Sequence, residues 1–163
     1  MHVATTSSPS IPDTQPAPSG ATKRASMQRV RARNGITSPG SVYTSLSNIH
    51  GRGVFAARRF EAGDVIEECP VLAVPGDQAP LLDETDLYGF TFEWEDGVAV
   101  ALGFGSLYNH SWNPNARYDH DYDRDLVVYS AVTAIDAGEE IRVNYNGDPD
   151  GRTELWFDTD SRP

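Results

Sequence analysis

Short runs of apolar, β-branched and aromatic residues, separated by turn residues, fill the chain from about residue 41 onward, whereas stretches with helical periodicity are scarce. Residues 95–97 (Glu-Asp-Gly) join two such runs and predict a hairpin turn whose glycine can adopt a positive φ. One short helix is predicted within 77–87, with Asp77 or Asp83 near its start. The predicted strands cover residues 41–46, 53–57, 64–74, 88–94, 98–103, 125–132 and 140–145. The fold class that follows is mostly β with few short helices.

The first 38 residues differ in composition from the rest of the chain. They are rich in Ser, Thr, Pro and Ala and contain few large apolar residues, so they cannot bury enough surface to offset the entropy lost on ordering. We therefore predict a disordered tail over 1–38. The remaining residues suffice for one compact core, and we expect a domain over 39–148 followed by a C-terminal segment over 149–163.

Charge is divided unevenly between the tail and the domain. The tail holds five of the 13 basic residues and one of the 24 acidic residues, which leaves the rest of the chain with a formal charge of −15. An acidic surface repels the nucleic acid backbone and favours basic protein partners, so we expect no direct nucleic acid binding by the folded domain. The basic tail fits a contact with nucleic acid or a membrane, an import signal, or simply a solubilising leader.

Cysteine content and apolar patterning bear on the compartment. The single cysteine, Cys69, lies in an apolar run and is predicted to pack in the core. One cysteine excludes an intrachain disulfide and a cysteine-based zinc cluster within one chain. Because no apolar run is long enough to span a bilayer and no signal-peptide stretch is seen, we expect a soluble intracellular protein without membrane contact, cytoplasmic or nuclear, in its own cell or in a host.

Two acidic loops raise the alternative of a calcium site. Residues 146–151 (Asn-Gly-Asp-Pro-Asp-Gly) match the start of a calcium-binding loop, but the twelfth position is Phe157 instead of a bidentate Glu. Residues 119–125 alternate Asp without the required glycine. We interpret both loops as solvated turns and predict no metal site; a small calcium-binding β domain is the weaker alternative.

Three separated segments carry most of the chemically useful groups. Residues 51–56 (GRGVFA) place two glycines around an arginine before a strand, residues 108–116 (YNHSWNPNA) gather Asn and His, and residues 137–145 (AGEEIRVNY) end a strand in a tyrosine. Taken singly, such residues are more typical of a tight turn, a polar loop and a packed strand. The functional interpretation depends on the combination and order of the three segments.

This order, GRGVFA, then NHSxxPNA, then AGEEIxxxY, resembles the SET-domain protein-lysine methyltransferases over residues 41–146. The resemblance implies a β-clip fold of small sheets, with a pseudoknot-like threading in which the segment after NHS passes through a loop formed by the preceding chain. It also implies transfer of a methyl group from S-adenosyl-L-methionine to the ε-amine of a protein lysine. The cofactor and the lysine are then expected to enter from opposite faces.

The resemblance also implies roles for individual residues. Glycine lets the backbone approach a cofactor closely because it has no side chain, and an Asn amide offers both donors and an acceptor. Methyl transfer is an in-line displacement, so alignment supplies much of the rate; the tyrosine is expected to orient groups, while water can take the lysine proton. The implied residues are Gly51, Arg52, Gly53, Asn109 and His110 for the cofactor and Tyr145 for catalysis.

The chain departs from the common pattern of this family in two places. Many members carry a cysteine after NHS that helps to hold zinc; here Trp112 stands there and no cysteine follows, so no such zinc site is expected. Asn144 stands where Asp is common, which is a conservative change. The zinc segment also closes one wall of the lysine channel, and an aromatic lid or simple packing near the C-terminus can replace it. The candidate residues of the substrate channel are Tyr88, Tyr118, Trp156 and Phe157, with Trp94 a weaker one.

The leading functional hypothesis is therefore a protein-lysine methyltransferase acting on a basic lysine-containing segment, such as a histone-like tail or a ribosomal protein. The alternative is a non-catalytic SET-like module that binds a basic peptide. Retention of Tyr145 together with Asn109 and His110 favours the enzyme. Substrate identity, the number of methyl groups transferred and the oligomeric state are not determined by the sequence.

Overall fold

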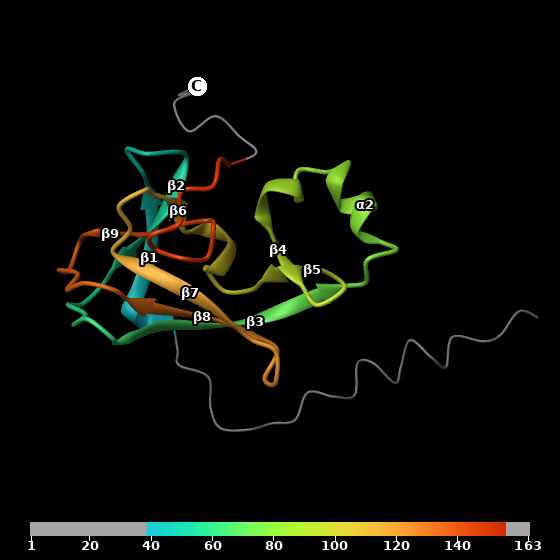
Figure 1. Ribbon diagram of the computed structural model, residues 1–163. Helices are drawn as coiled ribbons and strands as arrows, with labels where there is room; N and C mark the ends of the chain where they lie inside the picture. The colour runs from blue at the N-terminus through green and yellow to red at the C-terminus, as the bar shows by residue number, and fades with distance from the viewer. Residues whose placement is uncertain (1–38, 156–163) are drawn as a thin grey trace, which may run out of the picture. The chain divides into compact units, whose positions relative to one another are not determined.

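The computed structural model describes residues 39–155. The predicted tail over 1–38 and the candidate lid residues Trp156 and Phe157 lie outside the described residues. The predicted fold class, mostly β with few short helices, is confirmed, and the strands form two sheets (Figure 1). Among the helices within 39–155, none has the length and apolar character needed to cross a membrane.

The first sheet brings together the three segments singled out in the sequence. Its strand order is β1 (Val42–Leu46), β2 (Arg52–Ala56), β9 (Glu140–Val143) and β6 (Asn109–His110). β1 and β2 form an antiparallel pair, β2 pairs antiparallel with β9, and β9 pairs in parallel with β6. The late strand β9 is thus placed between an early strand and the strand of the NHS segment.

The second sheet is antiparallel throughout. Its order is β4 (Thr91–Trp94), β5 (Gly97–Ala101), β3 (Val65–Val74), β8 (Leu126–Ala131) and β7 (Ala116–Asp121). β3 is ten residues long and pairs with β8 along its first part and with β5 along its last part. Strands β4 and β7 are consequently the two edges of this sheet.

The helices are short. They are α2 (Ala79–Asp83) and the 3-10 turns η2 (Pro39–Ser41), η3 (Tyr88–Phe90) and η4 (Gly105–Leu107). The predicted helix within 77–87 is confirmed; Asp77 lies near its start, directly before the N-cap Gln78, whereas Asp83 is its last residue. Pro80 lies in the first turn, where its missing N–H costs nothing. Tyr88 does not begin a strand; it begins η3, and the strand starts three residues later.

Two strands were not predicted, and the positive φ of one turn was assigned to the wrong residue. β6 is only two residues long, and β7 has a polar sequence, yet all six residues of β7 pair with β8. In the turn between β4 and β5 the positive φ belongs to Glu95 (47°) and not to Gly97. Gly97 is needed for a different reason, because a Cβ there would overlap the carbonyl oxygen of Val74.

The core follows the alternation of buried residues along the strands. In β9 alternate residues are buried, and in β2 Gly53, Val54 and Ala56 are buried. Cys69 is fully buried, which confirms its predicted place in the core. Each large apolar side chain that is fully buried contributes about 1.5–3 kcal/mol to folding. The core comprises Val42, Val54, Ala56, Phe60, Ile66, Cys69, Trp94, Ala99, Ala101, Tyr108, Ala116, Val127, Tyr129, Ala131, Ile135, Ile141 and Val143.

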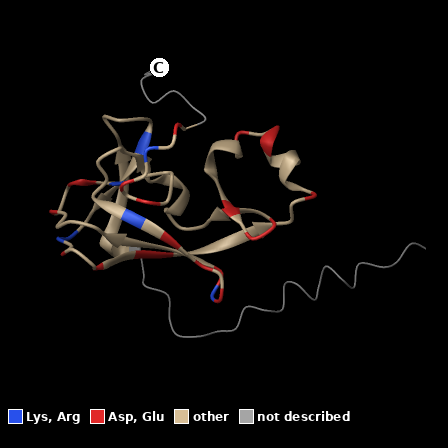
Figure 2. Cartoon of the chain, in the orientation of Figure 1, with Lys and Arg blue, Asp and Glu red and all other residues tan. Residues whose placement is uncertain are grey.

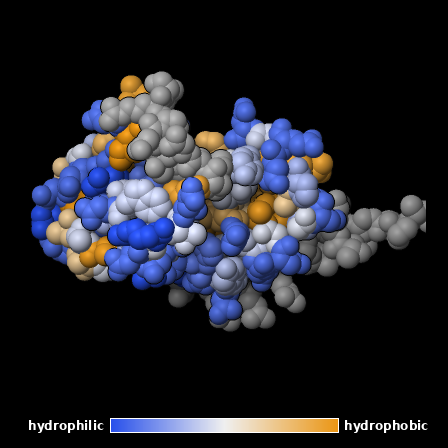
Figure 3. Space-filling view, turned by 45° about the horizontal axis from the view of Figure 1, so that its top comes forward, coloured by the Kyte–Doolittle hydropathy of each residue, from blue (hydrophilic) through white to orange (hydrophobic). Residues whose placement is uncertain are grey.

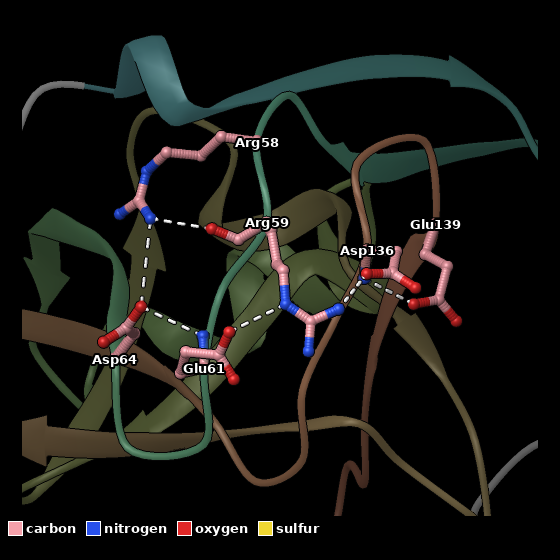
Figure 4. Close-up of polar contacts among 6 residues, drawn as sticks. All are labelled: Arg58, Arg59, Glu61, Asp64, Asp136 and Glu139. Atoms are coloured by element: carbon pink, nitrogen blue, oxygen red, sulfur yellow. Dashed lines mark hydrogen bonds and ion pairs between the residues drawn. The ribbon is translucent and has the colours of Figure 1, made fainter.

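The loop after β2 is joined to the loop before β9 by a backbone bridge and by exposed ion pairs. Phe60 and Ile135, both fully buried, form an isolated antiparallel bridge. Beside it, Arg59 contacts both Glu61 and Asp136 (Figure 4). Because exposed ion pairs contribute at most about 1 kcal/mol each, the buried bridge, more than the charges, determines where β9 begins.

Candidate active site

The carboxylate of Glu140 is the point at which the three sequence motifs meet. Its Oε2 accepts a hydrogen bond from Ser47 Oγ (2.9 Å), and its Oε1 accepts one from Asn109 Nδ2 (2.7 Å). Asn109 Nδ2 also donates to the carbonyl of His50 (3.1 Å). One side chain of β9 thereby fixes the turn before β2 against β6. The sequence interpretation missed both Glu140 and Ser47; the signal for Glu140 was its place in the GEEI segment.

The neighbouring residues Asn109 and His110 are oriented by these contacts. Asn109 is only 7% exposed, and its amide nitrogen is engaged, so its carboxamide oxygen is the atom suited to a ligand. His110 Nδ1 accepts a hydrogen bond from the backbone N–H of Tyr145 (3.2 Å), which places the proton of the neutral ring on Nε2. Burial lowers the pKa of His110 and favours this neutral form.

The two glycines of the GRG segment serve different purposes. Gly51 has a φ of +45°, and a Cβ there would meet nothing within 4 Å, so the backbone is left uncovered at this point. Gly53 is buried: a Cβ there would overlap Glu140 Oε1 and lie 2.9 Å from Asn109 Nδ2. Gly53 is thus required by packing at the Glu140 junction, while Arg52 between them is exposed.

Tyr145 lies just beyond β9 and is held by contacts at three of its atoms. Its hydroxyl donates to the backbone carbonyl of Tyr108 (2.8 Å), its N–H donates to His110, and its carbonyl accepts from the hydroxyl of Tyr118 (3.0 Å). The rings of Tyr145 and His110 meet edge to face with centroids 5.3 Å apart. The predicted catalytic tyrosine therefore has a fixed orientation next to the predicted cofactor residue His110.

Burial controls the ionisation of the tyrosines at this site. Burial and the charge of Tyr118 raise the pKa of Tyr145 to about 12, and burial together with Glu93 raises the pKa of Tyr118 to about 12. Tyr145 as a whole residue is 37% exposed, but its hydroxyl is directed at the Tyr108 carbonyl. At neutral pH both phenols are protonated, so they can donate hydrogen bonds and cannot serve as bases.

The same pKa shifts predict the stability of the domain in alkali. Unfolded tyrosine has a pKa of about 10, and burial raises the pKa of Tyr108 and of Tyr129 as well. Above pH 10 the tyrosines of the unfolded chain release protons that the buried tyrosines of the folded domain retain. The free energy of unfolding is therefore expected to fall as the pH rises through about 10 to 12. Urea unfolding at a series of pH values measures this loss, and a midpoint unchanged up to pH 11 would contradict it.

A cleft of about 780 Å³ opens on one side of Tyr145. It is bordered by the two edge strands of the second sheet, through Phe92 of β4 and Tyr118 of β7, and η3 adds Tyr88. The predicted channel residues Tyr88 and Tyr118 thus lie in one cleft with Tyr145. Trp94 does not line it; this residue is 3% exposed and belongs to the core. The face in Figure 3 shows apolar surface between more hydrophilic areas.

The described lining of this cleft is acidic. Asp83, Glu93 and Asp119 contribute carboxylates, and among the lining residues that the structure describes there is neither a lysine nor an arginine. Acidic residues are spread widely over the described part of the chain (Figure 2). A cationic side chain entering the cleft would therefore meet negative potential and aromatic walls, a combination that attracts ammonium groups.

A buried acid lies beside Tyr108, the residue whose backbone carbonyl accepts the hydrogen bond of the Tyr145 hydroxyl. Glu67, 2% exposed, accepts hydrogen bonds from the hydroxyl of Tyr108 (2.9 Å) and from the backbone N–H of Phe104 (3.0 Å). The Tyr108 ring also stacks on Tyr129 with centroids 4.1 Å apart. These contacts hold Tyr108 in place, and the backbone carbonyl of Tyr108 accepts the hydrogen bond from the Tyr145 hydroxyl. The sequence interpretation missed Glu67, although an acid between Ile66 and Cys69 in an apolar run was a signal.

Two asparagines of the motifs have structural contacts. Asn115 is buried; its side chain donates to the carbonyl of Glu140 (2.9 Å) and accepts from the N–H of Arg142 (2.8 Å), which pins β9 to the NHS loop. Asn144, 3% exposed, donates to the carbonyls of Gly151 (2.8 Å) and Pro149 (3.4 Å). Asn144 therefore folds the chain back immediately after β9.

The replacement Asn144→Asp is expected to destabilise the domain by about 1–3 kcal/mol. A carboxylate cannot donate, so it would face the carbonyls of Gly151 and Pro149 without a hydrogen bond. Urea unfolding measures the change, with Asn113→Asp as the control because that side chain is exposed. Equal stability of the two variants would mean that the turn does not depend on the Asn144 donor.

Trp112, at the position where the resemblance to the family led us to compare it with a zinc-binding cysteine, packs on the site instead. Its ring meets that of His110 edge to face with centroids 4.5 Å apart. Within residues 39–155 no group of three or more His, Cys, Asp or Glu side chains is arranged to hold a metal ion. Trp112 thus supports the imidazole of His110 by packing.

Comparisons with known proteins agree with this arrangement. The family model described as the SET domain matches residues 51–146. The chain is 33% identical over 113 residues, 68% of its length and 73% of the relative's, to a histone-lysine N-methyltransferase of Schizosaccharomyces pombe that is specific for H3 lysine-37. A Plasmodium falciparum protein assigned as a histone methyltransferase has a crystal structure that matches with a TM-score of 0.57 and 28% identity, over 64% of this chain and 92% of that one.

A large complex also contains a similar fold. The inhibitor-bound Polycomb Repressive Complex 2 of Chaetomium thermophilum matches with a TM-score of 0.56 and 24% identity, over 64% of this chain and 14% of that chain. At this identity the likeness shows the fold alone.

Proposed function

Because this chain belongs to the SET domain family and is a protein-lysine methyltransferase, we propose that it binds S-adenosyl-L-methionine beside Gly51, Asn109 and His110 and methylates a histone lysine that enters through the acidic cleft. The observation that carries the proposal is the position of Tyr145. It contacts His110 of the NHS strand and also lines the cleft. Two ligands approaching from these two sides would meet at its hydroxyl.

The residues present fit a cofactor of this kind. S-adenosyl-L-methionine supplies a methyl group on a positively charged sulfur. The backbone at Gly51 is uncovered, as approach of a cofactor requires. The carboxamide oxygen of Asn109 can accept a hydrogen bond from an ammonium group, and backbone groups beside His110 can pair with a purine edge. Carbonyl and phenol oxygens, such as those of Tyr108 and Tyr145, suit the neighbourhood of a polarised methyl group.

The lysine must be aligned and must lose a proton before it reacts. The carboxylates of Asp83, Glu93 and Asp119 attract the ammonium to the cleft. Farther in, the aromatic walls desolvate it and favour the neutral amine, whose unperturbed pKa is about 10.4. The amine can then hydrogen-bond to oxygen at Tyr145 or Tyr108, which directs its lone pair for an in-line displacement. Water takes the released proton.

A histone tail is the substrate that these features support best. The S. pombe relative is named for histone H3, and histone tails are basic and extended. The edge strands β4 and β7, which border the cleft, present backbone groups to which an extended peptide can add as a strand. A histone substrate also supports a nuclear location for the enzyme.

Methyl transfer to purified histones tests the proposed function. The full chain is incubated with methyl-labelled S-adenosyl-L-methionine and separate core histones, with Tyr145→Phe in parallel. We expect label on a lysine of one histone with the natural chain and little with the variant. If the natural chain binds a basic peptide in calorimetry but labels no histone or other basic protein, the chain is a binding module and not a histone methyltransferase.

The replacement Gly53→Ala is expected to raise the Kd for the cofactor about 10-fold, which corresponds to about 1.4 kcal/mol. The added methyl group would overlap Glu140 Oε1 and push on Asn109 Nδ2, and overpacking of this kind typically costs about 1–3 kcal/mol. Calorimetry with the cofactor measures the change. Ser45→Ala is the control, since Ser45 is the exposed partner of Gly53 on β1. An unchanged Kd in a folded Gly53→Ala protein would refute a role of the Glu140 junction in cofactor binding.

A further inference from the structure

We propose that Glu93 determines substrate specificity by binding an arginine that flanks the target lysine of the substrate. The proposal rests on the proposed function, because it concerns the same cleft and the same peptide substrate. It assigns a recognition role to one residue of β4 and names the chemistry that this residue selects, a guanidinium group close to the reacting lysine.

Glu93 is an exposed residue of the edge strand β4, and it lines the cleft that contains Tyr145. Its carboxylate lies close enough to Tyr118 to raise the pKa of that residue, after the larger effect of burial. The hydroxyl of Tyr118 in turn donates to the backbone carbonyl of Tyr145 (3.0 Å). Only the side chain of Tyr118 therefore separates the Glu93 carboxylate from the residue at which the target lysine is expected to react.

The negative charge of Glu93 is not neutralised by its surroundings. Among the residues that the structure describes, none forms an ion pair with Glu93. Asp119, on the opposite edge strand β7, is paired with Arg117. His120 does not supply the missing charge, because burial lowers its pKa against smaller opposing effects of Asp119 and Glu93. A cation of the substrate can therefore neutralise Glu93.

The rings beside Glu93 favour a guanidinium over an ammonium group. Phe92 meets the rings of Tyr118 and His120 edge to face, with centroids 5.3 Å and 6.2 Å apart, and all three line the cleft. A guanidinium is planar and weakly hydrated, so it can lie against such rings while it donates two hydrogen bonds to one carboxylate. An ammonium is a compact and strongly hydrated charge, which loses more hydration in the same place. These neighbours therefore select arginine.

An arginine at Glu93 fits the same extended peptide that presents the target lysine to Tyr145. Tyr118 and His120 lie two residues apart on β7, which places His120 about 6.6 Å farther along the strand. Glu93 acts on the ionisation of both residues, so its carboxylate lies beside this stretch of β7. Because an extended peptide advances about 3.3 Å per residue, a residue about one or two positions from the lysine reaches Glu93.

Steady-state methylation of matched peptides tests the proposal. The peptides contain the lysine that the full chain labels in a histone. Each of the two positions before it and the two after it carries arginine in one peptide and citrulline, which is neutral and of nearly the same shape, in its partner. At one of these positions we expect a kcat/KM about 5-fold higher with arginine, mainly through KM, as for one ion pair near the surface. Added salt should reduce this preference.

The replacement Glu93→Gln keeps the shape of the side chain and removes its charge, so the preference for arginine is expected to disappear. The two peptides are compared within one variant, and a general loss of folding or activity therefore cancels from their ratio. Glu95→Gln is the matched control, because Glu95 is exposed in the turn after β4 and is not part of the cleft lining. This variant should keep the preference of the natural chain.

The outcomes distinguish this proposal from the proposed function. If the natural chain methylates the arginine and citrulline peptides equally at every position, the specificity proposal is overturned and the histone activity stands. A preference that persists in Glu93→Gln, or that Asp83→Asn removes in its place, would overturn the assignment to Glu93. If no histone is labelled at all, the proposed function fails and the specificity proposal fails with it.

Discussion

The replacement Tyr145→Phe is expected to lower kcat for lysine methylation by about 10²- to 10³-fold, the loss typical when one positioned hydrogen-bonding group is removed from a reaction centre. The Tyr145 hydroxyl donates to the Tyr108 carbonyl, and Tyr145 lines the cleft. Without it the amine loses one of the two oxygens that direct its lone pair, and misplacement by about 1 Å alone costs on the order of 10²-fold. Single-turnover rates with a histone peptide measure the effect.

A matched control separates chemistry from folding. Tyr43→Phe removes the same atom from an exposed tyrosine of β1 whose ring stacks on Phe55 and which does not line the cleft. We expect its kcat and its unfolding midpoint to equal those of the natural chain. If Tyr145→Phe retained more than about a tenth of the natural kcat, its hydroxyl would not be part of the reaction centre.

The pH dependence of the rate is a second, independent test of the role of Tyr145. Because burial raises its pKa to about 12, the hydroxyl stays protonated from neutral pH to at least pH 10. The rate is therefore expected to rise with pH as lysine loses its proton, with no additional step from tyrosine ionisation in that range. An additional step near pH 7 to 8 that disappears in Tyr145→Phe would mean that Tyr145 acts as a base.

The second large effect is expected for Glu67→Ala, which should destabilise the domain by about 4 kcal/mol. The replacement leaves the buried hydroxyl of Tyr108 and the N–H of Phe104 without their acceptor, and each stranded group costs about 1–3 kcal/mol. Urea unfolding at neutral pH measures the loss. Where the variant still folds, kcat is expected to fall as well, because Tyr108 presents the carbonyl that receives the Tyr145 hydroxyl.

Glu61→Ala is the control for this replacement. It removes the same side chain from an exposed position, where Glu61 contacts Arg59 (Figure 4), and exposed ion pairs contribute at most about 1 kcal/mol. A similar loss of stability in both variants would show that Glu67 contributes only as a surface charge does, which its burial argues against.

Much of the fold was predictable because alternation along a strand depends only on local sequence. The strand positions of β1, β2, β3, β5, β8 and β9 followed from it with shifts of one or two residues at most ends. β6 and β7 were not predictable in the same way. β6 has two residues, and β7 reads Ala-Arg-Tyr-Asp-His-Asp, so only their pairing with β9 and β8 makes them strands.

The candidate site, too, was predictable from the sequence only in part. The motif order singled out Gly51, Asn109, His110 and Tyr145, and the structure brings these segments together, while their roles toward cofactor and substrate stay proposals. Glu140 and Glu67, which hold the site from two sides, were not singled out. The local signals, a place in the GEEI segment for Glu140 and a place in an apolar run for Glu67, are too weak to separate these two acids from the others among the 24 of an acidic chain.

By itself the sequence determined the mostly β class, the acidic character of the domain and the family, because composition, alternation and ordered motifs are properties of the chain read in order. Only the tertiary structure decided that Gly53 serves packing at Glu140, that Asn144 must donate hydrogen bonds, and that Tyr88 and Tyr118 share a cleft with Tyr145. These facts depend on contacts between segments up to 93 residues apart, such as Ser47 with Glu140. Such contacts exist only once β9 has taken its place between β2 and β6.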